Sequence, residues 1–559
     1  MKSYPTLREL LEGAVQEVPH DWPFAHWHDG TDWRVNTYAE TLERVKIFAE
    51  WFGEQGLVPR KTKVALILPN SPMWIELYLS VVSISGTVVP IDPKLTPSEV
   101  HYILSDSGAA FVITDASHLK SLASMAPTLP DLRGVLSVDP VPAEFPVKGA
   151  CVADVLAAAP DDLPLRFWND AAYRPQEEDI CGVLYTSGTT GQPKGAMLTH
   201  RNFSADAACT LDLVSGGVKF VTPDDNFMVV LPLFHAFSFL VNFVVALQAR
   251  SQMSYMRSLR TIVDDVAANR PTVLAVVPLM AEKIYARLME KAKATWAGRM
   301  ALRFFPRVIG KRVHQTLGGR LRVIIAGGAK SDPEILRGFN RMGVPMVEGY
   351  GLTECAPVVC VCPPRRIRIG SIGPIIWGVE GRIANPDPRG VGELQVRGPI
   401  TFKGYWNKPE ATEESFDGDW LRTGDLASID SEGYVTIRGR AKSLIVNREG
   451  KNIYPEEVEQ AIARNPLVES VIVMAYHAHG EPGEKVGVLL SPSQEQLDRL
   501  HPGATPEEVE KLLRDAVHAQ CEALAAYKHP RKIVVSMTPL ELTSTHKVRR
   551  GIYAGTLDE

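Results

Sequence analysis

Short apolar runs alternate with stretches of helical spacing along the first part of the chain. Val64–Leu68 is apolar and strand-like, Met73–Ser85 is an apolar helix that follows a Pro-Asn-Ser-Pro start, and Val88–Ile91 is the next strand. Ala110–Thr114 and Gly134–Val138 continue the series of strands. This alternation predicts a doubly wound α/β fold, in which helices cover a largely parallel sheet.

The segments around this core follow different patterns. Helical spacing predicts helices at Thr6–Val15 and Asn36–Gln55, which pack as a first layer. The Pro-, Ala- and Asp-rich stretch Pro140–Arg174 is predicted to be a surface connection. Further strands are predicted at Pro271–Pro278 and Leu321–Ala326.

One apolar stretch, Val229–Ala249, is long enough to cross a bilayer. However, Pro232, His235, Asn242 and Gln248 lie within it and would be costly in lipid. The pattern therefore favours a buried helix beside an apolar pocket.

The end of the chain has the pattern of a small α+β domain of about one hundred residues, within the usual range for a domain. A strand and turn at Gly392–Gly398 belong to a β-rich part that precedes it. The predicted elements of the small domain are Ser443–Val446, Pro455–Arg464, Val468–Ala475, Pro506–Ala526 and Lys532–Val535.

Composition limits the classes of protein. A chain of 559 residues is too long for one core, so two or more domains are expected. The net charge of −5 gives no general attraction to nucleic acid, and the N-terminal segment lacks an apolar signal core. Seven irregularly spaced cysteines form no disulfide framework, which favours a reducing cytoplasm. Cys355, Cys360 and Cys362 match no common zinc spacing and are expected to be buried or in strands.

The segment Gly298–Arg322 is strongly basic and partly apolar. Its basic residues are Arg299, Arg303, Arg307, Lys311, Arg312, Arg320 and Arg322. A solvated helical face is the default interpretation, and an amphipathic element on anionic lipid is the alternative.

The richest candidate for chemistry is Tyr185–Gly195, with the sequence YTSGTTGQPKG. Gly188 and Gly191 allow successive N–H groups to form a cradle for anionic oxygens, and Lys194 adds one mobile positive charge. Hydroxyl donors come from Thr186, Ser187, Thr189 and Thr190. The loop leaves an apolar strand, where α/β folds usually bind ligands. It lacks the Gly-Lys-Ser/Thr of kinase and ATPase P-loops, and the alternative is a flexible surface hairpin.

This string resembles the phosphate loop of the adenylate-forming superfamily, which holds acyl- and aryl-CoA synthetases, luciferases and peptide-synthetase adenylation domains. Further motifs of that superfamily follow in the expected order up to Lys547. The resemblance implies a large N-terminal domain, 1–439, of doubly wound subdomains plus a β-rich part. It also implies a small mobile α+β lid, 440–559.

The resemblance implies contacts with the nucleotide or CoA from many of these motif residues. They are Thr186, Ser187, Gly188, Thr189, Thr190, Gly191, Lys194, Gly327, Gly328, Ala329, Tyr350, Gly351, Asp425, Arg440, Lys442 and Gly450. The glycine turn Gly327-Gly328-Ala329 is implied to lie against adenine, although Lys330 stands where many relatives have Pro. Asp425 is implied to hold the ribose, Lys442 to be the hinge, and Gly450 to lie in the turn that lines the CoA thiol passage.

The catalytic residues implied are Thr353, Glu354, His235 and Lys547. Thr353 is implied to hold the α-phosphate or carboxylate, and Glu354, with Thr190, a magnesium ion, which prefers oxygen ligands. His235 is implied to border the carboxylate site, with Phe237–Val245 walling the acyl group; a satisfied core histidine is the alternative.

The C-terminal motif, Thr543-Ser-Thr-His-Lys547, resembles the form found in bacterial long-chain fatty acid–CoA ligases, although His546 replaces the usual Gly. The charge of Lys547 can neutralise the approach of a carboxylate to the α-phosphate.

The resemblance thus implies a ligase of fatty acid metabolism that uses ATP, Mg²⁺ and CoA. It activates a medium- or long-chain fatty acid as acyl-AMP and transfers the acyl group to CoA. The alternatives are an acyl-AMP ligase or acyl-ACP synthetase that serves a carrier protein, a silent lipid-binding protein, and a luciferase-like oxygenase. The expected location is the cytoplasm, with peripheral contact at the inner face of an anionic membrane as an option. The oligomeric state stays open, a homodimer included.

Overall fold

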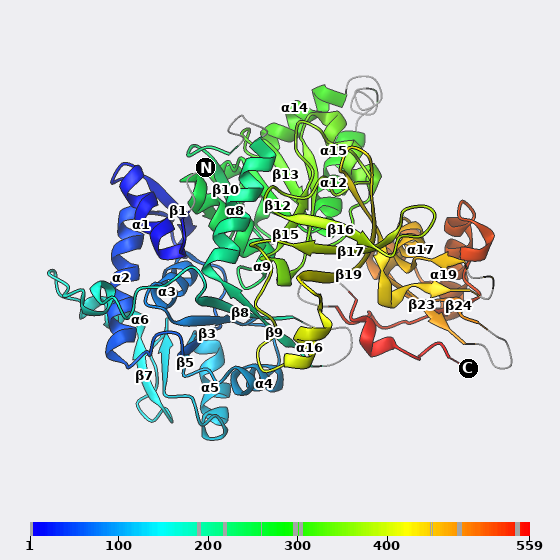
Figure 1. Cartoon of the computed structure of the whole chain (residues 1–559). Helices are drawn as coiled ribbons and strands as arrows, with labels where there is room; N and C mark the ends of the chain where they lie inside the picture. The colour runs from blue at the N-terminus through cyan, green and yellow to red at the C-terminus, as the bar shows by residue number, and fades with distance from the viewer. Residues whose placement is uncertain are drawn as a thin grey trace. The chain divides into compact units, whose positions relative to one another are not determined.

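Two largely parallel sheets form the framework of the first of two compact units in the computed structural model (Figure 1). This unit comprises Met1–Ser187, Gln192–Glu380 and Val396–Leu421, and the second comprises Gly188–Gly191, Gly381–Gln395 and Arg422–Glu559. The structure describes residues 4–186, 192–215, 221–258, 260–294, 300, 306–447, 449, 451–477, 483–542 and 548–558.

The first sheet has seven strands in the order β7-β6-β5-β3-β4-β8-β9. Their bounds are β3 Lys63–Leu66, β4 Thr87–Pro90, β5 Phe111–Thr114, β6 Gly134–Ser137, β7 Lys148–Cys151, β8 Ile180–Thr186 and β9 Lys194–Thr199. Neighbours run parallel except β8 and β9, which are antiparallel. The expected surface connection at Pro140–Arg174 is partly wrong, because β7, α6 (Val152–Ala157) and α7 (Arg166–Asn169) lie within it.

The second sheet has eight strands in the order β15-β14-β13-β12-β10-β11-β1-β2. Their bounds are β1 Pro23–His28, β2 Trp33–Thr37, β10 Asn226–Val229, β11 Gln252–Tyr255, β12 Val273–Val276, β13 Val323–Ala326, β14 Met346–Gly351 and β15 Val358–Val361. The edge pairs β1–β2 and β14–β15 are antiparallel, and the pairs between them are parallel. Cys355, Cys360 and Cys362 are buried, as expected.

Helices connect and cover these strands. In the first unit they are α1 Leu7–Glu17, α2 Tyr38–Glu54, α3 Pro72–Val82, α4 Pro97–Ser107, α5 Ala116–Met125, α8 His200–Ser215, α11 Ile262–Asn269, α12 Pro278–Lys293, α14 Pro306–Thr316 and α15 Pro333–Met342. Several begin where the sequence supplies a capping side chain. Thr37 and Thr96 each form a reciprocal capping box with the Glu three residues later. The predicted doubly wound α/β fold is confirmed.

The apolar stretch around residues 229–249 is largely buried, as expected, and its half-buried residues lie within 232–237. It forms α9 (Ala236–Ser238), a π-helical segment η2 (Phe239–Val244) and α10 (Val245–Ala249). The Phe239 ring packs against Tyr78, Phe203 and Phe243 with centroid distances of 4.6, 4.8 and 5.2 Å. Within the described ranges, no helix has the length and apolar character needed to cross a membrane.

A β-rich part follows. Its sheet has the order β16-β17-β19-β18, with β20 paired to β19. The bounds are β16 Glu380–Ala384, β17 Gly392–Arg397, β18 Phe416–Asp417, β19 Trp420–Ile429 and β20 Val435–Arg440, and α16 (Pro409–Glu414) precedes β18.

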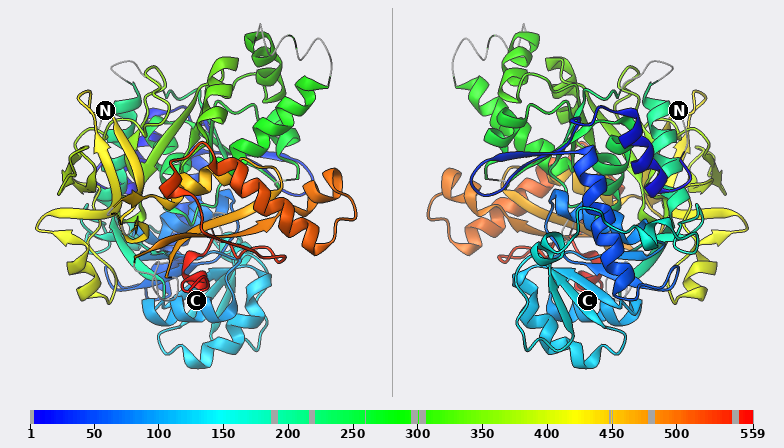
Figure 2. Two further views of the ribbon diagram at one scale, coloured as in Figure 1. Left: turned by 90° about the vertical axis from the view of Figure 1, so that its right-hand side faces the viewer. Right: turned by 90° about the vertical axis from the view of Figure 1, so that its left-hand side faces the viewer.

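The end of the second unit has a core of its own. β21 (Ile445–Val446) pairs with β22 (Asn452–Ile453), and β23 (Val468–Tyr476), β24 (Lys485–Pro492) and β25 (Lys532–Val535) form a three-stranded sheet. Helices α17 (Pro455–Ile462) and α19 (Pro506–Cys521) lie side by side against this sheet, as Figure 2 shows, and α18 (Gln494–Leu500) is short. The hydrophobic cluster here draws its buried residues from Ile445 to Ile533.

Candidate active site

The candidate phosphate loop connects β8 to β9, and both of its ends are fixed. Thr186, the last residue of β8, pairs with Lys194, the first of β9. Tyr102 Oη donates to Pro193 O at 3.1 Å, and Tyr185 Oη donates to Asp106 Oδ2 at 2.6 Å. Burial, reinforced by Asp106, raises the pKa of the Tyr185 phenol, so it stays a hydrogen-bond donor.

The middle of the candidate phosphate loop contains five of the predicted site residues. The predicted site residues Ser187, Gly188, Thr189, Thr190 and Gly191 lie outside the described residues. The antiparallel pairing of β8 and β9 gives the connection the topology of a hairpin. The contacts of its two ends hold that hairpin at one edge of the seven-stranded sheet.

A segment from a distant part of the chain lies along β9. Met197 N donates to Gly404 O at 3.0 Å, Lys403 N to Met197 O at 3.0 Å, and Trp406 N to Gly195 O at 2.8 Å. These bonds follow β9 from its middle to the end of the phosphate loop.

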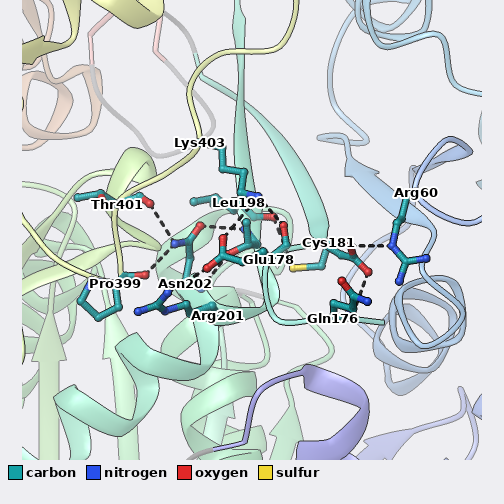
Figure 3. Close-up of polar contacts among 12 residues, drawn as sticks. Arg60, Gln176, Glu178, Cys181, Leu198, Arg201, Asn202, Pro399, Thr401 and Lys403 are labelled. Atoms are coloured by element: carbon teal, nitrogen blue, oxygen red, sulfur yellow. Dashed lines mark hydrogen bonds and ion pairs between the residues drawn. The ribbon is translucent and has the colours of Figure 1, made fainter. Parts of the chain in front are cut away.

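Asn202, at the start of α8, holds the approach of this segment (Figure 3). Its side-chain nitrogen donates to Pro399 O at 2.8 Å and to Thr401 O at 3.0 Å, while its oxygen accepts from Thr199 N at 2.8 Å. Lys403 Nζ donates to Glu178 O at 2.7 Å. Asn202 and Glu178 therefore both hold the segment 399–403, which leads to the residues beside the phosphate loop.

The glycine turn follows β13, as predicted. Gly327 is buried and its N–H donates to Val276 O at 3.1 Å, whereas Gly328 and Ala329 are exposed. A Cβ at Gly327 would lie 2.7 Å from Cζ of Phe237, and Gly328 has φ +83°. A side chain at the first position would displace the Phe237 ring, and the left-handed backbone at the second favours glycine.

The far end of the turn is anchored by Glu348. Ser331 N donates to Glu348 Oε1 at 2.9 Å. Burial raises the pKa of the Glu348 carboxyl, and the bond from Ser331 opposes this. Glu348 begins the stretch 348–354, with the sequence EGYGLTE, which contains the candidates Thr353 and Glu354. The bond therefore ties this signature to the glycine turn.

His235 lies where the buried helical stretch begins. It is half-buried, its ring lies 4.5 Å from that of Phe234, and its carbonyl accepts from Phe239 N at 2.9 Å. Asn70 fixes the chain just before it, since it donates to Leu231 O and accepts from Leu233 N, both at 2.8 Å.

The stretch that begins near His235 has a half-buried start and a fully buried continuation. Phe234, His235 and Phe237 are half-buried, whereas Phe239–Val245 are buried. The first residues are therefore the part of this stretch that solvent reaches.

The signature itself runs along β14. Tyr350 pairs with Cys360 and Gly351 with Val358. A Cβ at Gly351 would lie 1.7 Å from Pro357 O, and Leu352 N donates to that same oxygen at 3.0 Å. This close backbone contact places Thr353 and Glu354 in the short 3₁₀ helix η3 (Thr353–Cys355).

A buried carboxyl supports the strand that follows. Asp206 on α8 accepts from Val358 N at 2.7 Å and from Thr210 Oγ1 at 3.0 Å. Complete burial raises the pKa of Asp206 well above its ordinary value.

Glu354 is held by a residue that the sequence analysis did not select. Tyr405 Oη donates to Glu354 Oε1 at 2.6 Å, and Phe402 N donates to Glu354 O at 2.9 Å. The Tyr405 ring lies 5.2 Å from Lys194 Nζ. Lys194 and Glu354, predicted from separate motifs, thus contact the same tyrosine, one at its ring and the other at its hydroxyl. The aromatic residues of the loop Phe402–Asn407 were the only sequence signal for it.

In the second unit, the structure brings Asp425 and Arg440 together. They pair between β19 and β20, and Arg440 Nε lies 2.9 Å from Asp425 Oδ1. Asp425 N donates to Thr423 Oγ1 at 3.1 Å, and Arg440 Nη1 donates to Thr423 O at 3.4 Å. The carboxylate is buried and charge-balanced, which suits a fixed hydrogen-bond acceptor.

The remaining candidates lie beyond β20. Lys442 is exposed in the 3₁₀ turn η4 (Ala441–Ser443). Gly450 and Lys547 lie outside the described residues, and so does His546. The chain on either side of the Lys547 motif is joined by a bridge between Leu542 and Val548.

Comparison with known proteins gives a consistent result. The AMP-binding enzyme family model matches residues 11–406. The chain is 27% identical over 502 residues to the long-chain-fatty-acid–CoA ligase FadD15 of Mycobacterium bovis, covering 83% of this chain and 78% of that one. It is 30% identical over 487 residues to a feruloyl-CoA synthase of Amycolatopsis, covering 85% and 87%.

Solved structures agree with this comparison. ATP-bound MatB from Rhodopseudomonas palustris superimposes with a TM-score of 0.74 at 28% identity, covering 98% of each chain. The anthranilate CoA ligase AuaEII shares the fold, with a TM-score of 0.79 at 21% identity over 98% of this chain and 96% of that one. Since the family model covers well over half of the sequence, this chain belongs to the AMP-binding enzyme family.

Proposed function

We propose that this protein is an ATP-dependent ligase that activates medium- or long-chain fatty acids as acyl-AMP and then transfers the acyl group to CoA. The observation that carries the proposal is the meeting of Lys194, Tyr405 and Glu354. A cation of the phosphate loop and a carboxylate of the EGYGLTE signature contact the same tyrosine, which supports a shared role in binding one nucleotide.

The first half-reaction joins two anions, because a carboxylate must attack the α-phosphorus of ATP as pyrophosphate leaves. Its rate therefore depends on positioning and on charge neutralisation. In the proposal, Lys194 and the loop donors hold the phosphates, Thr353 holds the α-phosphate or the carboxylate, and Lys547 neutralises the approach.

The residues present suit the magnesium that these enzymes use with ATP. Glu354 offers a hard oxygen ligand, and among the described contacts only its Oε1 accepts a side-chain hydrogen bond. Its Oε2 is therefore the ligand atom we assign, with Thr190 as the second residue. When bound, the ion neutralises phosphate charge.

The second half-reaction is attack of the CoA thiol on the acyl carbonyl, with AMP leaving. We propose the domain division 1–439 and 440–559, with Lys442 as the pivot and Asp425 and Arg440 holding the nucleotide. The separate hydrophobic cluster from Ile445 to Ile533 supports a lid that folds around its own core.

Fatty acid is the proposed substrate because FadD15 is among the relatives, and an aromatic acid is the second candidate because of the feruloyl-CoA synthase. We expect CoA consumption with palmitate or oleate to exceed that with acetate by at least about tenfold, since each buried methylene adds apolar transfer energy. A free-thiol assay with acetate, octanoate, palmitate, oleate and ferulate measures this. Equal or greater activity on acetate would contradict the proposal, and a preference for ferulate would assign the aromatic class.

The acceptor is proposed to be CoA. Replacing CoA with a phosphopantetheinylated carrier protein in the same assay tests the alternative of an acyl-ACP synthetase. Faster transfer to the carrier would assign that role.

Contact with an anionic membrane remains a proposal that rests on charge. On α14, Arg307, Lys311 and Arg312 are exposed, whereas Val313 and Leu317 are buried in the core of the first unit. In the described part of this segment, the basic side chains are therefore accessible to a lipid surface, whereas the apolar side chains are packed in the protein core.

A proline at the pivot provides a test of the lid. We expect Lys442→Pro to form acyl-AMP within about tenfold of the wild-type rate, because proline fixes one backbone angle and traps the first pose. Thioester synthesis should fall much further. Single-turnover measurement of each half-reaction separates the two, with Lys442→Ala as the control that keeps the backbone free. If both rates fall together, or neither does, Lys442 is not the pivot.

A further inference from the structure

We propose that Tyr405 is a positioning residue for the adenylation step: it holds the Glu354 carboxylate in place for the metal and keeps Lys194 from pairing with it. The inference rests on the proposed function of Glu354 and Lys194. It concerns a residue that belongs to neither of their motifs.

The two ends of the Tyr405 side chain make different contacts. Its hydroxyl donates to Glu354 Oε1 at 2.6 Å, and its ring lies 5.2 Å from Lys194 Nζ. One side chain therefore contacts both the cation and the anion that the proposed nucleotide site needs.

The backbone holds the tyrosine in this place. Tyr405 N donates to Thr412 Oγ1 at 2.9 Å, and Tyr405 forms a β-bridge with Ala196 on β9. The Phe402 ring packs edge-on against it at 4.9 Å. Since Phe402 N also donates to Glu354 O, one short segment positions both the backbone and the side chain of Glu354.

A direct ion pair between Lys194 and Glu354 would weaken the binding of both groups to their proposed ligands. Opposite charges in contact attract strongly in a partly buried site, and a paired lysine and carboxylate would each lose much of their attraction for phosphate and metal. A neutral phenol avoids this. Its hydroxyl satisfies one carboxylate oxygen and leaves the other for a cation, while its π face attracts the ammonium without neutralising it.

The test separates the hydroxyl from the ring. Tyr405→Phe keeps the ring and removes the donor, so we expect the affinity for ATP with Mg²⁺ to fall about tenfold, the size of a hydrogen bond to a charged group. The affinity for ATP in EDTA should change less than twofold. Isothermal titration calorimetry on the full chain, with ATP plus Mg²⁺ and ATP plus EDTA, gives both values without turnover.

Two further variants sharpen the result. Tyr405→Leu removes the ring as well, so affinity for ATP should fall both with Mg²⁺ and in EDTA, as Lys194 becomes free to pair with Glu354. In a Glu354→Ala background, Tyr405→Phe should have no additional effect on the affinity for ATP with Mg²⁺. Tyr38→Phe is the matched control, because it removes a buried hydroxyl that donates to Ser251 O at the same 2.6 Å, away from these residues.

The outcomes distinguish this inference from the proposed function. The inference is overturned if Tyr405→Phe binds ATP with Mg²⁺ as tightly as the wild type, or if it loses affinity equally in EDTA. Additive effects in the Glu354→Ala background would also overturn it. If Tyr405→Phe weakens the binding of ATP with Mg²⁺ as expected but the wild type fails to consume fatty acid, the proposed substrate is wrong and the positioning role stands.

Discussion

Gly351→Ala is expected to reduce acyl-AMP formation by a factor of about a hundred or more, whereas Gly349→Ala should stay within about tenfold of the wild type. The two glycines flank Tyr350 on the same strand and differ in the space around them. A Cβ at Gly351 would lie 1.7 Å from Pro357 O, but one at Gly349 would lie 3.7 Å from Cys360 O, which is ordinary contact. The backbone oxygen cannot turn aside as a side chain could, so the strand must shift and carry Thr353 and Glu354 with it.

Fatty-acid-dependent exchange of pyrophosphate into ATP measures this effect. Thermal unfolding of both variants reports how much of the loss comes from stability. Equal activity of the two variants would contradict the role assigned to the contact between Gly351 and Pro357. A loss confined to Gly349→Ala would contradict it too.

Lys547→Ala is expected to slow acyl-AMP formation by about a thousandfold and to leave thioester formation from supplied acyl-AMP largely intact. Loss of a preorganised positive partner for developing charge has effects of this size. Only the first half-reaction brings two anions together, so only that step needs the lysine.

Single-turnover assays of the two half-reactions test the asymmetry. Arg549→Ala is the matched control, since it removes a nearby positive charge outside the motif and should affect neither step strongly. Equal losses in both half-reactions of Lys547→Ala would contradict a role for the lysine in the first step alone.

Much of the fold could be predicted because buried parallel strands are continuous apolar runs. β3, β4, β5 and β6 lie within a residue or two of their predicted positions. β7 was missed because Lys148–Cys151 is an edge strand with largely exposed side chains, set in a segment of loop-like composition. The hairpin β1–β2 gave no such run either, since polar residues interrupt both strands.

The site was predictable where residues act within one motif, and not where they meet across the chain. The glycine turn and the signature strand follow from local sequence. The contact between Tyr405 and Glu354 joins residues 51 positions apart, and the anchoring of Ser331 by Glu348 joins two motifs. Pairings of this kind are set by strand order, which periodicity does not reveal.

The division of the apolar stretch around η2 also bears on how new substrates can arise in this scaffold. Phe239 is fixed by the surrounding aromatic rings, so changes there cost stability, whereas Phe234, His235 and Phe237 are only half-buried. Substitution should therefore cost the least stability at the half-buried positions, which border the proposed acyl site. We expect libraries randomised at Phe234 and Phe237, with the catalytic candidate His235 kept, to yield folded enzymes with altered acid preference far more often than libraries randomised within η2.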